Sequence, residues 1–137
     1  MGLVPSFADV ERIIADLPEV TEGARFGHRT WFVHGKSFAW ERPYSKADLK
    51  RFGDEIPPGG PILAVNVEDL EEKEAVLAAG RRGIFTIEHF DNYPAVLIQL
   101  ERVGSRVLRD AIVDAWLASA PKGLADEFVA SGGLRRR

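Results

Sequence analysis

The residues best suited to chemistry in this sequence are cations that gather in one stretch. Between residues 25 and 53, seven side chains are basic and only two are acidic. Lysine and arginine spread over one surface can neutralise phosphates with little sequence preference, so this stretch is a candidate nucleic-acid-binding surface. The alternative is a solvated face balanced by acids elsewhere, because the whole chain has a net charge of −3 and a pI of about 5.6. The seven cations are Arg25, Arg29, Lys36, Arg42, Lys46, Lys50 and Arg51.

A second group of polar side chains lies in a short segment near residue 90. His89, Asp91 and Tyr93 fall within five residues, beside turn-forming Asn92 and Pro94. They could together form a small polar pocket, since histidine titrates near neutrality and loops often carry functional residues. The alternative is that these side chains only hydrogen-bond within the loop before the last strand.

The histidines do not predict a metal site, and the sequence has no catalytic motif. His28 and His34 would lie about 20 Å apart along an extended strand, too far to share one ion. The chain contains no cysteine, which excludes disulfides and thiolate chemistry. Its serines show no nucleophile elbow, and its glycines lack the spacing of a phosphate loop. We therefore predict no cofactor, no metal and no enzymatic activity.

The basic stretch begins with a predicted β-hairpin at residues 29–42. Two aromatic-rich segments flank His34 and Gly35, a pair that can supply a two-residue turn. With that turn, Val33 faces Lys36, Trp31 faces Phe38 and Arg29 faces Trp40, and all six side chains share one face of the sheet. The other face, with Phe32 among small and polar residues, is expected to be mostly solvated.

The remaining elements follow from hydrophobic periodicity and from capping and turn residues. Ser6 and Asp9 have capping-box spacing and precede a helix that Pro18 ends. Strands are expected at 62–67, 84–88 and 95–101, and helices from Asp69 to Gly80 and from Ser105 to about Ala120. Less regular segments are expected at 22–28 (an irregular entry or short edge strand), 45–53 (a helical turn), 54–61 (an exposed loop) and 124–128 (a last turn).

Length and composition favour one soluble domain. A chain of 137 residues with 45% hydrophobic residues can bury a substantial core, and no apolar run approaches the roughly 18 residues of a membrane span. We expect a single domain at residues 1–130, a flexible basic tail at residues 131–137 and no membrane partner. The N-terminus lacks the features of a signal peptide, so we predict a cytoplasmic protein.

The predicted order α-β-β-β-α-β-β-α favours an α+β two-layer sandwich, an antiparallel sheet with helices on one face. Its core should contain Trp31, Phe38, Val96, Ile98, Leu108 and Ile112. Three segments also carry a family likeness: Gly35-Lys36-Ser37-Phe38-Ala39, the strand from Pro61 into Glu68-Asp69-Leu70, and His89-Phe90-Asp91 before Tyr93-Pro94-Ala95-Val96. With these segments the chain resembles the MmcQ/YjbR family. Many members of that family carry a tryptophan in the final strand, where this chain has Ala95, Val96 and Leu97.

The resemblance implies a compact fold similar to the secretion-chaperone type, a DNA-binding role and no defined catalytic residues. The first hypothesis is therefore a small non-enzymatic module that makes non-specific phosphate contacts with DNA through the basic hairpin region. The alternative is a protein-interaction or chaperone-like module that uses the open sheet face. A third hypothesis is a small-ligand binder, or an enzyme, around His89 and Tyr93, which requires a concave pocket with converging polar groups.

Overall fold

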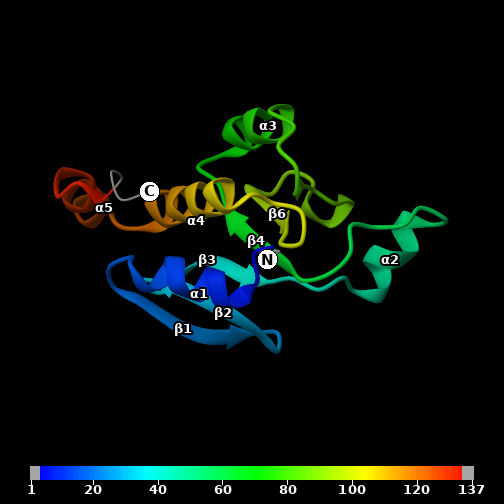
Figure 1. The fold of residues 1–137 in the computed structure, drawn as a ribbon, viewed down its shortest axis with the longest axis horizontal. Coiled ribbons are helices and arrows are strands. Elements are labelled where there is room, and N and C mark those ends of the chain that lie inside the picture. Colours follow the sequence, from blue (N-terminus) through cyan, green and yellow to red (C-terminus); the bar gives the residue numbers. More distant parts are fainter. Residues whose placement is uncertain (1–3, 134–137) are drawn as a thin grey trace.

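A six-stranded antiparallel sheet organises the chain, with the strand order β1-β2-β3-β4-β6-β5 (Figure 1). The computed structural model describes residues 4–133. Within them the strands are β1 (Val20–Arg25), β2 (His28–Val33), β3 (Lys36–Glu41), β4 (Ile62–Asn66), β5 (Ile84–Phe85) and β6 (Ala95–Gln99). The helices are α1 (Phe7–Ala15), α2 (Lys46–Phe52), α3 (Leu70–Ala78), α4 (Ser105–Ser119) and α5 (Lys122–Ala130), with a 3₁₀ turn η1 at Glu88–Phe90. The predicted α+β sandwich is confirmed.

Helices α1 and α4 cover one face of the sheet and enclose the main core. All six predicted core residues belong to this cluster, and Trp31, at 2% exposure, is the most accessible of them. The indole of Trp116 in α4 donates a hydrogen bond to the carbonyl of Pro18 after α1, at 3.1 Å. Phe128 in α5 packs on Trp116, with 4.9 Å between ring centroids. The predicted last turn is therefore a full helix, because Leu124 and Phe128 have this apolar surface to dock on.

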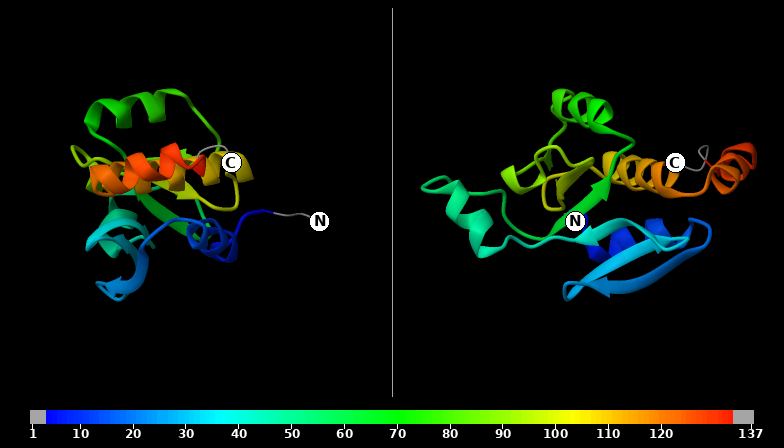
Figure 2. Two further views of the ribbon diagram at one scale, coloured as in Figure 1. Left: turned by 90° about the vertical axis from the view of Figure 1, so that its left-hand side faces the viewer. Right: turned by 180° about the vertical axis from the view of Figure 1, so that it is seen from behind.

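The opposite face of the sheet carries a second, smaller core. Ile62, Ala64, Ala95 and Leu97 point to this side from β4 and β6, and Phe90 of η1 packs over them. Phe52 of α2 also contacts this cluster. Over β1, β2 and β3, in contrast, Figure 1 shows α1 in front of the strands, and the view from behind in Figure 2 shows no helix of the described residues over them. This half of the second face is open.

The predicted hairpin is confirmed, but its register is not the predicted one. His34 and Gly35 both have positive φ, 48° and 77°, as a two-residue type I′ turn requires. Val33 does face Lys36, but the pairing then skips Phe38, so that Trp31 faces Ala39 and Thr30 faces Trp40. Phe38 is the extra residue of a β-bulge, which shifts every later side chain of β3 to the other face. Trp40 consequently lies on the second face, not with Trp31 in the main core.

Two other strands differ from their predicted extent. Of the two alternatives for residues 22–28, the edge strand is present: β1 runs from Val20 to Arg25 and pairs with the whole of β2, after a turn at Phe26 and Gly27. The strand expected at residues 84–88 has only two residues, because the chain leaves the sheet after Phe85 and forms η1. This departure carries residues 88–93 over the second face.

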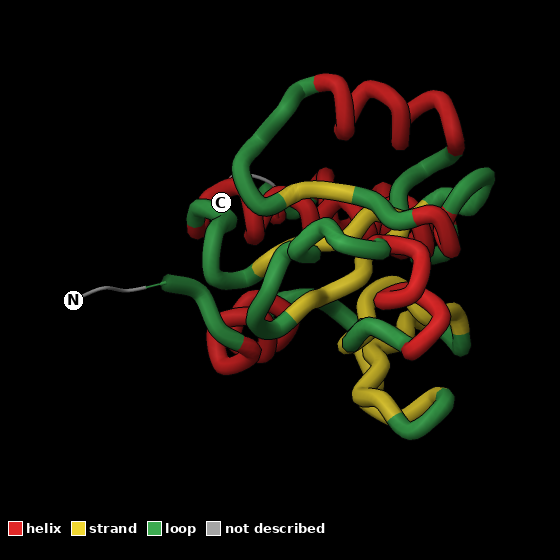
Figure 3. Tube along the Cα trace, turned by 90° about the vertical axis from the view of Figure 1, so that its right-hand side faces the viewer, coloured by secondary structure: helices red, strands yellow, loops and turns green. Residues whose placement is uncertain are grey.

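Loops connect the peripheral helices to the sheet (Figure 3). The capping box predicted for α1 is confirmed, because Asp9 accepts a hydrogen bond from the backbone N–H of Ser6 at 2.8 Å. A second capping box begins α2: the Ser45 hydroxyl accepts from the backbone N–H of Asp48 at 3.0 Å, and the Asp48 carboxylate accepts from that of Ser45 at 2.9 Å. The segment at residues 54–61 has no helix or strand, as predicted. Residues 134–137 of the predicted tail lie outside the described residues, within which no helix is long and apolar enough to cross a membrane.

Candidate functional site

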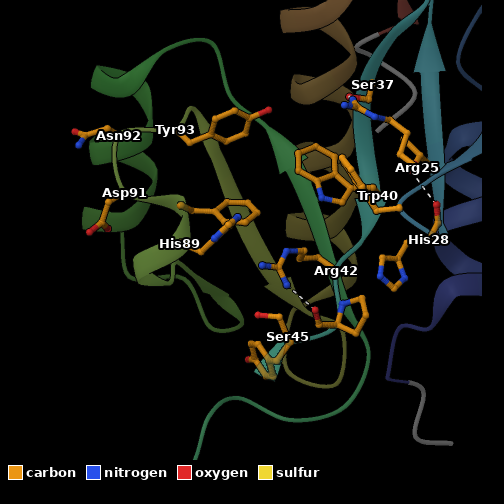
Figure 4. A pocket seen from close by; sticks show the side chains of 15 residues that line it. Arg25, His28, Ser37, Trp40, Arg42, Ser45, His89, Asp91, Asn92 and Tyr93 are labelled. Atoms are coloured by element: carbon orange, nitrogen blue, oxygen red, sulfur yellow. Dashed lines mark hydrogen bonds between the residues drawn. The ribbon is translucent and has the colours of Figure 1, made fainter. Parts of the chain in front are cut away.

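A cavity of about 660 Å³ occupies the open half of the second sheet face (Figure 4). Three segments that are distant in the sequence form it: the strands β1, β2 and β3, the turn that leads into α2, and the segment from η1 to β6. Its volume falls in the range typical of small-molecule sites. The lining residues are Arg25, Phe26, His28, Thr30, Ser37, Trp40, Arg42, Pro43, Tyr44, Ser45, His89, Phe90, Asp91, Asn92 and Tyr93.

The register of the sheet determines which side chains of β1, β2 and β3 line the cavity. Arg25 faces His28 across β1 and β2, and Thr30 faces Trp40 across β2 and β3, so these four side chains share the open face. Thr30 is 1% exposed, and its hydroxyl donates to the carbonyl of His28 at 3.0 Å. The guanidinium of Arg25 donates to the Ser37 hydroxyl at 3.2 Å. Arg25 remains exposed, with no carboxylate partner among the described residues.

An aromatic wall runs from Trp40 on β3 to Phe90 and Tyr93 on the opposite side of the cavity. The rings of Trp40 and Phe90 are nearly parallel, at 26°, with 6.3 Å between their centroids. Tyr93 meets Phe90 edge to face, with centroids 5.8 Å apart, and Figure 4 shows the Tyr93 ring extended toward Trp40. Tyr44 is anchored by its hydroxyl, which donates to the carbonyl of Pro58 at 2.6 Å. These rings give the cavity flat apolar surfaces suited to another ring.

Arg42 is a cation held in place at the base of the cavity. Its guanidinium donates to the carbonyl of Pro43 at 2.5 Å, pairs with the Asp48 carboxylate at 2.9 Å and lies over the Phe90 ring, 5.5 Å from the centroid. Only 15% of the Arg42 side chain is exposed, and none of the Asp48 side chain. A guanidinium fixed on three sides offers its remaining N–H groups in a defined direction.

The Asp48 carboxylate is stabilised in its charged form. Burial alone raises its pKa, but the backbone N–H of Ser45 and the guanidinium of Arg42 outweigh this effect, so the pKa lies below its ordinary value of 3.8. Asp48 Oδ1 accepts no hydrogen bond within the described chain and lies 3.6 Å from Arg51. The pKa of Tyr44 is raised, chiefly because its hydroxyl is partly buried and secondly because the negative charge of Asp48 is near.

A buried lysine fixes the segment that carries the aromatic wall. Lys73 of α3 is 6% exposed, and its ammonium donates to the carbonyls of Phe90 and Tyr93 at 2.5 and 2.8 Å. Burial lowers its pKa from 10.5, an effect that Asp91 partly offsets. Because both acceptors are backbone atoms, Lys73 holds the backbone of residues 90–93 in place regardless of the side chains there.

The structure separates the seven predicted cations into four locations. Arg25 and Arg42 line the cavity. Arg29 faces the other side of the sheet, where it pairs with Glu11, Glu22 and Glu41, and its pKa is raised chiefly by its hydrogen bonds to Glu11 and Glu22. Exposed Lys36 lies directly after the hairpin turn, and Lys46, Lys50 and Arg51 lie on α2.

The three residues of the predicted small pocket all line the cavity. Figure 4 shows Asp91 pointing away from Trp40, whereas Tyr93 points toward it. Trp40 was predicted for the main core, and the sequence did not indicate Thr30, Ser37 or Tyr44 as site residues. For Trp40 the missing information was the bulge. The described residues contain no group of three or more metal-ligating side chains.

A family model for YjbR matches residues 15–118, which include the sheet and all the residues that line the cavity. This chain belongs to the YjbR family. It is 44% identical over 128 residues to uncharacterised proteins of Mycobacterium bovis and of two Mycobacterium tuberculosis strains, which covers 91% of this chain and 96% of each relative. No solved structure matches the chain. The predicted family is therefore confirmed.

Proposed function

We propose that this YjbR family protein is a binding module that holds a small molecule in the cavity beneath β1, β2 and β3. The cavity carries the proposal, because it combines a volume of about 660 Å³ with aromatic walls and a few polar groups that converge on one space. This proposal corresponds to the ligand binder expected around His89 and Tyr93. It assigns no catalytic residue.

Ser37 offers a direct test, because its side chain lines the cavity from β3 and a larger residue there would fill the space. A library of metabolites is screened by thermal shift and ligand-observed NMR against the parent, Ser37→Phe and Thr21→Phe. Thr21 is exposed on the same sheet face but does not line the cavity, so its replacement is the matched control. Compounds that bind the parent and Thr21→Phe but not Ser37→Phe support the proposal. A library without hits, or hits that all bind Ser37→Phe equally well, would overturn it.

DNA binding is a second candidate, favoured by the exposure of Lys36, Lys46 and Lys50. None of these three lysines pairs with a carboxylate among the described residues, so each is available to a phosphate. Against this, Arg29 and Arg51 are engaged by acids, which reduces the positive charge that the stretch presents. A protein-interaction role for the open sheet face also stays a prediction.

A further inference from the structure

The tip of the β1–β2 hairpin places a large aromatic side chain at the rim of the cavity. Phe26 lines the cavity yet is 90% exposed. Its φ of 53° lies in the left-handed region, which is unfavourable for a bulky residue and is normally occupied by glycine or asparagine. A strained, solvent-exposed phenylalanine contributes little to the folded state, and such conformations cluster at ligand clamps.

The groups around Phe26 pair flat apolar surfaces with cations. The Arg25 guanidinium lies 5.7 Å from the centroid of the Phe26 ring, and the Arg42 guanidinium lies 5.5 Å from that of Phe90. Arg42 is fixed by Asp48, whereas among residues 4–133 the Arg25 side chain hydrogen-bonds only to the neutral Ser37 hydroxyl. A ligand anion that meets Arg25 therefore gains a charge-assisted hydrogen bond without displacing a carboxylate.

The charges also indicate which ligands are disfavoured. Asp91 points away from the cavity, and Asp48 lies behind Arg42 with no exposed surface, so no carboxylate among the lining residues is directed at a bound cation. A neutral polar ligand would leave the aromatic wall and the two arginines without matching groups. A ring that carries an anionic group matches both.

We propose that the ligand is a planar aromatic molecule with a phosphate or carboxylate, whose ring stacks between Phe26 and the Trp40–Tyr93 wall while its anion pairs with Arg25 and Arg42. This inference rests on the proposed function and adds the ligand class and a specificity residue. Phe26 touches the ligand ring, and Arg25 selects the anion. The strain at Phe26 is the cost of presenting that ring.

Paired probes test the ligand class by isothermal titration calorimetry. Adenosine monophosphate is compared with adenosine and inorganic phosphate, and nicotinate with nicotinamide. The phosphate arm and the carboxylate arm distinguish the two anions. We expect at least one aromatic anion to bind about tenfold or more tighter than its neutral partner, and tighter than phosphate alone. Equal affinities within both pairs, or no binding by any probe, would overturn the ligand class.

Tryptophan fluorescence locates the bound ring. Trp31 and Trp116 are 2% and 0% exposed, so acrylamide quenching reports mainly on half-buried Trp40. Protection of this signal by the aromatic anion, and not by inorganic phosphate, is expected when the ring covers Trp40. Binding that leaves the quenching unchanged would contradict stacking in this cavity.

Three variants separate the role of Phe26 from that of folding. Phe26→Asn relieves the unfavourable φ, so it should be at least as stable as the parent, yet it should bind the aromatic anion about threefold to tenfold more weakly. Arg25→Gln should lose the preference for the anion over its neutral partner. Ile56→Ala removes another exposed apolar side chain, 94% exposed and outside the cavity, and should change nothing.

Failure of this inference is distinguishable from failure of the proposed function. If library compounds bind the parent and lose affinity for Ser37→Phe, but are neutral or lack a ring, the cavity binds ligands and the ligand class is wrong. If Phe26→Asn and Ile56→Ala bind the aromatic anion as tightly as the parent does, Phe26 has no part in recognition.

Discussion

Arg42 and Asp48 form an ion pair of 2.9 Å that connects the cavity to α2. The Asp48 side chain has no exposed surface, so the pair is shielded from solvent on the helix side. Asp48 also accepts the backbone N–H of Ser45, the N-cap residue, so it both completes the capping box of α2 and serves as the counter-ion of the cavity arginine. Folding of this short helix and orientation of Arg42 are therefore coupled.

This coupling predicts unequal effects of the same substitution in two capping boxes. Asp48→Ala should lower the free energy of unfolding by about 2–3 kcal/mol, because it removes a cap and leaves Arg42 without its partner. Asp9→Ala removes the corresponding cap of α1, but its partner Arg12 is 66% exposed, so the loss should be about 1 kcal/mol or less. Urea denaturation compares the two. Equal losses would show that the buried pair adds nothing beyond capping.

The lowered pKa of Asp48 predicts a pH dependence of stability. A carboxyl group whose pKa is lower in the folded state stabilises it fully above its ordinary pKa of 3.8, and this contribution is lost as the pH falls through the folded-state value. The stability difference between the parent and Asp48→Asn should thus be largest near neutrality and shrink as the pH falls below 3.8. Urea denaturation across this pH range measures it. A difference that grows in acid would reverse the assigned direction.

Replacing Lys73 of α3 should loosen the segment at residues 88–93, which lies outside that helix. Lys73→Met keeps the length and apolar character of the side chain but leaves the carbonyls of Phe90 and Tyr93 without their donor. The loss should be about 1–3 kcal/mol, with faster hydrogen exchange at residues 88–93. Lys46→Met on exposed α2 is the control and should leave both measurements unchanged. Unaltered exchange at residues 88–93 in Lys73→Met would contradict the anchoring role.

The main core gives a stability prediction independent of the cavity. Ile98 of β6 is fully buried and faces Leu63 on one side and Ile84 on the other. Ile98→Ala should therefore cost about 2–5 kcal/mol, from lost burial and from the cavity that remains. Thermal or urea unfolding measures this loss. A value below about 0.5 kcal/mol would mean that β6 is wrongly placed.

Local signals in the sequence predicted much of this fold, because short-range chemistry determines those features. The His34-Gly35 turn needs only two residues that accept positive φ, and the capping box at Ser6 needs only a carboxylate three positions later. The alternation in β6 directs Val96 and Ile98 to the main core, as expected. Each of these features depends on neighbours within about four residues.

The cavity could be predicted only in part, because its walls meet through long-range pairing. Polar residues close together indicated His89 and Tyr93, and charge indicated Arg25 and Arg42. The alternation of apolar and polar residues in β3 does not indicate the bulge at Phe38, because either Phe38 or Ala39 could occupy a buried position. The placement of Trp40 therefore became visible only in the structure. The acids that engage Arg29 come from α1, β1 and β3, which no local pattern brings together.

Two lysines of α2 distinguish DNA binding from ligand binding, because they are exposed and do not line the cavity. Lys46 and Lys50 are four residues apart on α2 and exposed, so both can meet one phosphate backbone. If they do, Lys46→Ala with Lys50→Ala should bind mixed-sequence duplex DNA less tightly than the parent and flatten the log–log salt dependence by up to about two units.

Fluorescence anisotropy over a salt series measures this slope. The control is Arg81→Ala with Arg82→Ala, which removes the same charge from exposed residues outside the basic stretch and should keep the parent's slope. If the parent does not bind at about 50 mM salt, where non-specific phosphate contacts are strong, DNA binding through this surface is excluded. Equal slopes for the two double variants would mean that any binding follows overall charge and not the basic stretch.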